Sequence, residues 1–104
     1  MIKIISVEVS KEIELVLGSA IEIIVFLTQD KPYSIKITIH DPIRQVIINA
    51  VTMTRINSKI YRYVYQSSSS GTLGLYIVTI EVSDGTNTSV KQIEFILNQQ
   101  LQDI

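Results

Sequence analysis

Apolar and polar residues alternate along most of the chain. The clearest example is the segment 33–40, in which every odd position is apolar and every even position is polar. Successive side chains of a β-strand point to opposite faces, so a period of two predicts strands with one buried and one wet face. No window of a dozen residues has an apolar stripe with the helical period. The pattern therefore predicts an all-β chain.

Eight segments have this pattern, and residues typical of turns separate them. These turn residues include Gly18, the pair Asp41-Pro42, and the pair Asp84-Gly85, a strong hairpin signal. The longest polar connection covers 67–74. The predicted strands lie near 2–9, 12–17, 20–28, 33–40, 45–54, 59–66, 75–83 and 88–97. Seven or eight short antiparallel strands at this spacing predict a β-sandwich with Greek-key connections.

The composition fits one globular domain. The chain has 104 residues, of which 46% are hydrophobic and 18% charged, and a net charge of −1. We assign 1–97 to a single domain and 98–104 to a C-terminal tail or linker. A near-neutral charge argues against broad binding to nucleic acid, and no apolar run approaches the roughly 20 residues of a membrane-spanning helix. Because the chain has no cysteine, it has neither a disulfide nor a thiolate metal ligand.

Several segments carry a resemblance to a known family, and they are 37–42, 46–48, 53–55, 60–65, 73–78 and 81–85. Together they resemble the middle strands of bacterial, archaeal and phage immunoglobulin-like domains, which share the sandwich of fibronectin type III and macroglobulin-like modules. The resemblance covers 5–97 and implies an immunoglobulin-like β-sandwich. The disulfide and core tryptophan of antibody domains are absent, which excludes that subfamily. By this resemblance Tyr76 takes the role of a tyrosine corner, whose hydroxyl bonds to nearby backbone. The alternative is an ordinary core aromatic.

The polar residues do not form the pattern of an active site. His40 and Asp41 are adjacent, so in a strand they face opposite ways, and no Gly-x-Ser-x-Gly nucleophile motif is present. We expect His40 to be a surface residue that leads into the following turn. Glu12, Glu14 and Glu22 alternate with apolar residues, which places them on solvated faces. The sequence therefore predicts a protein that is not an enzyme.

Metal and phosphate sites have equally little support. Asp30, Asp41, Asp84 and Asn87 are scattered, whereas a calcium loop has several such residues at alternate positions. The serine run 67–70 lacks the lysine and the following helix of a phosphate-binding loop. We therefore expect no cofactor.

Tyr61, Tyr63 and Tyr65 alternate and share one face of a predicted strand. The opposite face carries Arg62, whose burial would be costly, so we place the tyrosine face in the interior. The alternative is an exposed aromatic strip that binds a carbohydrate or a protein partner.

Apolar residues also occupy faces that should be wet. If the intervening residues point inward, then Ile24, Phe26, Leu75 and Ile77 point outward. Ile2 and Ile4 join them if Ile5, Val7 and Val9 face in. A contiguous apolar patch usually marks an interface. Our interpretation is a protein–protein interface, the alternative being that another strand or the tail covers these residues.

These observations favour a non-enzymatic structural or interaction module that packs against copies of itself or a larger assembly. The resemblance and the absence of a signal peptide suggest a virion component on a tail or capsid surface, cytoplasmic before assembly. The alternative is a repeat module of a cell-surface adhesin, or an accessory domain of a secreted enzyme that binds carbohydrate. The N-terminal strand can pair within its own domain or complete a neighbour's sheet.

Overall fold

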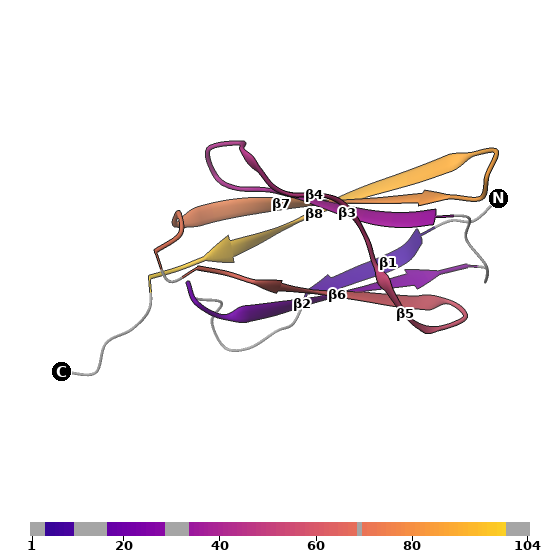
Figure 1. Ribbon diagram of the computed structural model, residues 1–104, viewed down its shortest axis with the longest axis horizontal. Coiled ribbons are helices and arrows are strands. Elements are labelled where there is room, and N and C mark those ends of the chain that lie inside the picture. Colours follow the sequence, from indigo (N-terminus) through magenta and orange to yellow (C-terminus); the bar gives the residue numbers. More distant parts are fainter. Residues whose placement is uncertain (1–3, 10–16, 29–33, 69, 100–104) are drawn as a thin grey trace.

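The computed structural model describes residues 4–9, 17–28, 34–68 and 70–99, and over these residues the chain is all-β, as predicted. Its strands form two antiparallel sheets of four, in the orders β1-β2-β6-β5 and β4-β3-β7-β8. Figure 1 shows the two sheets stacked as the layers of a sandwich. The eight strands are β1 (Ile4–Val9), β2 (Ala20–Leu27), β3 (Ser34–His40), β4 (Val46–Thr52), β5 (Thr54–Asn57), β6 (Ile60–Gln66), β7 (Gly74–Ser83) and β8 (Thr88–Leu97).

The hydrophobic core lies between the sheets and is built from alternate residues of the central strands. Along β2, β3 and β7 the buried positions alternate with partly or fully exposed ones. Isoleucine and valine, branched at the β-carbon, pack well on a pleated surface of this kind. The most deeply buried side chains of the described residues are Ile21, Ile23, Val25, Leu27, Ile37, Ile39, Val78, Ile80, Val82 and Leu97.

The prediction of a single strand over 45–54 is wrong, because this segment contains β4 and the beginning of β5. The chain changes sheets at Met53, so β4 belongs to one sheet and β5 to the other. The Met53 side chain is buried, and its backbone N–H donates a hydrogen bond to the carbonyl oxygen of Ile35 at 3.1 Å. Figure 1 shows this segment descending from the upper sheet to the lower one. The apolar alternation continues through the corner, which is why the sequence pattern does not reveal it.

The first strand pairs within its own domain, because β1 lies antiparallel to β2. A register shift between Ile4 and Ser6 changes which residues face inward. Ile4 therefore packs against the core with Val7 and Val9, and the expectation that it points outward is wrong. Ile2 and most of the strand predicted over 12–17 lie outside the described residues. Within the described part of the chain, no helix has the length and apolar character needed to cross a membrane.

Candidate functional site

The outer face of the β1-β2-β6-β5 sheet carries the first pair of predicted interface residues. Ile24 and Phe26 project from β2 on this face and are half-buried. The register places Phe26 beside Ile60 and Ile24 beside Arg62. Arg62 forms an ion pair with Glu22, so charged side chains flank the apolar ones. This arrangement leaves Ile24 and Phe26 as a small apolar area bordered by charge.

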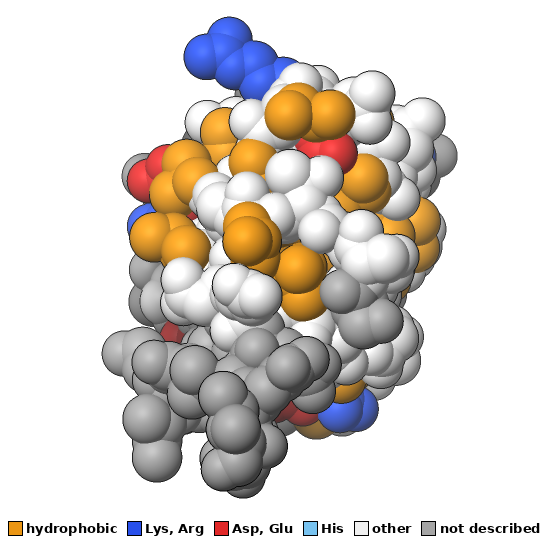
Figure 2. All heavy atoms as spheres, turned by 90° about the vertical axis from the view of Figure 1, so that its left-hand side faces the viewer, with side chains coloured by type: hydrophobic (Ala, Val, Ile, Leu, Met, Phe, Trp, Pro, Cys, Tyr) orange, Lys and Arg blue, Asp and Glu red, His pale blue; other side chains and the backbone are white. Residues whose placement is uncertain are grey.

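The outer face of the β4-β3-β7-β8 sheet carries the second pair. Leu75 is 39% exposed on β7, and Ile77 is half-buried two residues further along. The register places Leu75 opposite Ile96 of β8, whose side chain is 52% exposed. Other exposed apolar residues cluster toward the same end of this sheet, and they are Ile43, Val46 and Leu73. Figure 2 views this end of the molecule, where hydrophobic side chains gather in several groups separated by polar atoms.

The four predicted interface residues thus belong to two opposite surfaces of the sandwich. Ile24 and Phe26 lie on β2, whereas Leu75 and Ile77 lie on β7 of the other sheet. The core separates the two sheets, so a single flat partner surface can contact only one of the pairs. Of the two, the β7 pair has the more exposed surroundings.

The three tyrosines of β6 face the other sheet. Tyr61 is buried in the core, and Tyr63 and Tyr65 are half-buried against it. The Tyr65 ring lies 6.4 Å from that of Tyr76, centroid to centroid. Arg62 projects to the opposite, outer face. The described geometry therefore offers no flat aromatic platform on the outside of the sandwich.

Tyr76 is held on both its ring and its hydroxyl. The ring stacks on Phe95 with 5.2 Å between centroids and a 7° interplanar angle. The hydroxyl donates a hydrogen bond to the Thr72 carbonyl oxygen at 2.6 Å. Burial raises the pKa of the Tyr76 phenol, and the nearby Asp41 carboxylate raises it further, against a lowering by the Thr72 bond. Burial likewise raises the pKa of Tyr65, with smaller contributions from Tyr76 and Asp41.

Asp41 lies in the turn that the sequence predicted, but its burial was not indicated by the sequence. Its side chain is buried, and its Oδ1 atom accepts hydrogen bonds from the backbone N–H groups of Ile43 and Gln45, at 3.1 and 2.8 Å. These bonds organise the turn between β3 and β4. An aspartate before a proline suggests such a turn, but its burial depends on β7 and β6 lying nearby, which are distant in sequence.

The remaining polar candidates stay apart. His40 is half-buried on the outer face of β3, opposite Ile77 and Val46, while its neighbour Asp41 is turned into the fold. Glu12, Glu14 and Asp30 lie outside the described residues. Within the described residues, no three histidine or acidic side chains come together as metal ligands would. Asp84 and Asn87 share the turn between β7 and β8, where the Asp84 Oδ1 atom accepts the Asn87 backbone N–H at 2.7 Å.

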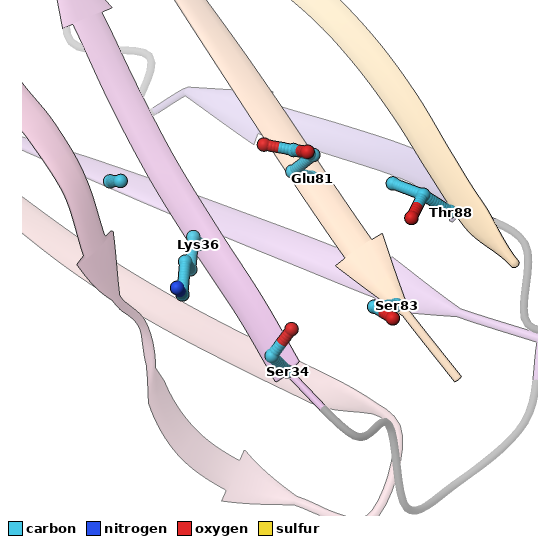
Figure 3. A pocket seen from close by; sticks show the side chains of 6 residues that line it. Ser34, Lys36, Glu81, Ser83 and Thr88 are labelled. Carbon is cyan, nitrogen blue, oxygen red and sulfur yellow. The ribbon is translucent and has the colours of Figure 1, made fainter. Parts of the chain in front are cut away.

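A shallow polar hollow of about 180 Å³ lies on the outer face of the β4-β3-β7-β8 sheet. The cross-strand pair Lys36 and Glu81 is part of its lining. Figure 3 shows their side chains on the same face as those of Ser34, Ser83 and Thr88. The residues that line the hollow come from four strands, so no local sequence motif predicts it. Its lining has neither the aromatic surface of a sugar site nor a nucleophile bonded to a base.

Comparison with known proteins adds no relative. A scan against protein-family models finds no match, and a search of curated proteins finds none either. Over the residues that the structure describes, the chain is all-β, with two four-stranded antiparallel sheets.

Proposed function

We propose that this protein is a non-enzymatic interaction module built on an immunoglobulin-like sandwich. The sheet order supports the immunoglobulin-like assignment, because β1-β2-β6-β5 corresponds to strands A, B, E and D of a constant-type domain. The strands β3, β7 and β8 then correspond to C, F and G, with β4 added beside C. The bond from the Tyr76 hydroxyl to Thr72, at the start of the F-like strand, agrees with a tyrosine corner.

The observation that carries the proposal is the exposed apolar area around Leu75. Leu75 and Ile96 are cross-strand neighbours on an outer sheet face, and Ile43, Val46 and Leu73 lie toward the same end. Neighbouring apolar side chains left in water favour burial against another surface. The partner is a protein, either another copy of the chain or a component of a larger assembly. The resemblance to phage immunoglobulin-like domains makes a virion surface the setting that we propose.

The opposite face gives weaker support, because Ile24 and Phe26 are half-buried beside the Arg62–Glu22 ion pair. Binding of a carbohydrate on an aromatic strip gains no support, because Tyr61, Tyr63 and Tyr65 face the core. We therefore assign the anchor to the Leu75 side.

The test compares two single substitutions at matched exposure. Leu75 is 39% exposed on one outer face, and Val64 is 40% exposed on the other. We expect Leu75→Asp to reduce association, measured by light scattering over a wide concentration range, while Val64→Asp leaves it unchanged. Circular dichroism checks that both variants fold.

A second arm examines the β2 face with the pair Ile24→Asp and Phe26→Ser. If this pair abolishes association and Leu75→Asp does not, the anchor is on the wrong sheet. If neither change affects association, apolar packing by the outer faces is not the function.

A further inference from the structure

Two opposite charges stand next to each other on the outer face of the β4-β3-β7-β8 sheet without pairing. Lys36 of β3 and Glu81 of β7 are direct cross-strand neighbours, and both side chains are exposed. Within the described residues neither of them forms an ion pair. Figure 3 shows the Lys36 side chain directed away from the Glu81 carboxylate. Because both residues line the shallow hollow, a partner molecule can reach one positive and one negative group side by side.

The surroundings of this pair are neutral and small. The row of cross-strand neighbours that contains the pair continues to Thr52 on β4 and to Val90 on β8. The next row toward the Leu75 end has Thr38 and Thr79 on the two central strands. In these two rows, charge on β3 and β7 is therefore confined to Lys36 and Glu81, and the threonines leave room for another surface to approach.

A second copy of the same face carries the matching charges, and the strand pattern restricts how it can be placed. Two sheets that pack face to face keep their strands within about 30° of each other, so a two-fold axis between identical sheets runs either along or across the strands. An axis across the strands places each strand over its own counterpart. The outer positions are Ser34, Lys36, Thr38 and His40 on β3, and Leu75, Ile77, Thr79, Glu81 and Ser83 on β7. Because β3 has no acidic residue among them and β7 no basic one, no axis across the strands can pair the two charges.

An axis along the strands exchanges the two sides of the sheet and keeps each row at the same height. An axis on β3 places Lys36 over Lys36, and an axis on β7 places Glu81 over Glu81, and contacts between like charges are unfavourable. An axis between β4 and β3 places Lys36 over Thr52, and one between β7 and β8 places Glu81 over Val90. Only an axis midway between β3 and β7 places Lys36 of each copy over Glu81 of the other.

We propose that two copies of this chain pack face to face through their β4-β3-β7-β8 sheets, with the two-fold axis along the strands between β3 and β7. Lys36 of each copy then forms an ion pair with Glu81 of the other, and the two ion pairs lie side by side at the hollow. This inference rests on the proposed function, for which it names a second copy of the chain as the partner.

The same axis brings the apolar ends of the two faces together. Because it runs along the strands, the Leu75 end of one copy meets the Leu75 end of the other. Leu75 is 39% exposed, and Ile43 in the nearby β3–β4 turn is 61% exposed, so their burial favours association. Glu94 of one copy lies over Val46 of the other at the rim, on the edge strands, where solvent reaches a carboxylate. The apolar end thus supplies affinity, while the charged pairs select the partner and the register.

The first test reverses one charge at a time. Lys36→Glu places two carboxylates in each contact, and Glu81→Lys places two ammonium groups there. We expect each variant alone to weaken dimerisation by about tenfold or more in light scattering, because two attractive contacts become repulsive. The matched controls are Lys59→Glu in the β5–β6 turn and Glu8→Lys on β1, exposed positions away from this face, and they should leave dimerisation unchanged. Circular dichroism checks that all four variants fold.

The second test mixes the Lys36→Glu and Glu81→Lys variants. In the mixed dimer the two substituted positions face each other with opposite charges, and the two native side chains, Glu81 of one variant and Lys36 of the other, do the same. We expect the mixture to regain wild-type association in light scattering. A damaged fold cannot produce this recovery, because each chain keeps its own substitution. A mixture that associates no better than either variant alone, or a wild-type protein that is monomeric at every concentration, would overturn the proposal.

The two proposals fail in different ways. Loss of association in Leu75→Asp, with no effect of either charge reversal, overturns the face-to-face register and leaves the interaction function standing. Recovery of association in the mixture, together with no effect of Leu75→Asp, supports the face-to-face dimer and removes the Leu75 anchor.

Discussion

The Tyr76 hydroxyl donates a hydrogen bond to the carbonyl oxygen of Thr72, four residues earlier in the chain, with 2.6 Å between the two oxygen atoms. The bond ties the end of the serine-rich connection to the beginning of β7. The same ring stacks on Phe95 of β8, so one side chain links a loop and two strands.

We expect Tyr76→Phe to lower the free energy of unfolding by about 1 kcal/mol, the usual net contribution of one hydrogen bond. The phenyl ring keeps its stacking on Phe95, so Tyr76→Leu should cost more than Tyr76→Phe. Urea-induced unfolding followed by circular dichroism measures both variants. A Tyr76→Phe variant as stable as the wild type would show that the bond contributes nothing net.

A second prediction concerns alkaline pH. The pKa values of Tyr65 and Tyr76 are raised in the folded state, mainly because burial disfavours the charged phenolate. In the unfolded chain both phenols lose their protons near their ordinary pKa of 10.0, while the folded state still holds them. The unfolded state then binds fewer protons, so stability is fully present below pH 10 and falls as the pH rises above it.

Urea midpoints measured from pH 8 to pH 11 test this expectation. Tyr65→Phe should reduce the decline, because it removes one of the two groups. An identical decline in wild type and variant would contradict the assignment to Tyr65.

The turn between β7 and β8 should respond to acid. The Asp84 Oδ1 atom accepts the backbone N–H groups of Asn87 and Thr86, at 2.7 and 2.8 Å, and these bonds lower the pKa of Asp84 below 3.8. Its contribution to stability is therefore present above the unfolded pKa and is lost as the pH falls through the folded one. We expect Asp84→Asn, which keeps the acceptor oxygen, to flatten this part of an acid unfolding profile, and Asp84→Ala to lower stability at neutral pH. A wild-type profile shared by both variants would argue against a role for this carboxylate.

Asp41 offers a prediction for the turn between β3 and β4. Asp41→Ala removes the acceptor of the Ile43 and Gln45 N–H groups, so we expect a loss of about 2 kcal/mol in the free energy of unfolding. Asp41→Asn keeps an oxygen at Oδ1 and should lose less. The matched measurement is chemical unfolding of the three proteins at neutral pH. Equal stability of the alanine and asparagine variants would show that the two bonds are not the cause.

The sequence pattern predicted local structure better than long-range arrangement. The alternation at Ile35, Ile37 and Ile39 places these residues in the core, as observed, because side-chain direction along a strand is a local property. The sheet to which a strand belongs depends on pairing between distant segments. For that reason the pattern could show that Ile24 and Leu75 point outward, but not that they point away from each other.

The sequence pattern also did not predict two irregularities of the backbone, the corner at Met53 and the register shift in β1. Val51 and Met53 keep the period of two up to the corner, so the predicted strand was too long. In β1 the alternation changes phase between Ile4 and Ile5, where the register shift lies, and this gave the wrong direction for Ile4. The buried Asp41 was missed because its neighbours in space come from β6 and β7. A bare sequence pattern contains no signal for such contacts.

The corner at Met53 affects where local unfolding of the sandwich begins. Along one long side of the sandwich, the buried Met53 alone connects β4 to β5, so no loop separates the two sheets there. Along the other, β1 and β8 touch across the gap without a direct covalent link between them. Transient separation of the two sheets should therefore start on the β1–β8 side. Amide hydrogens there should exchange with solvent before those around Ile35 and Met53.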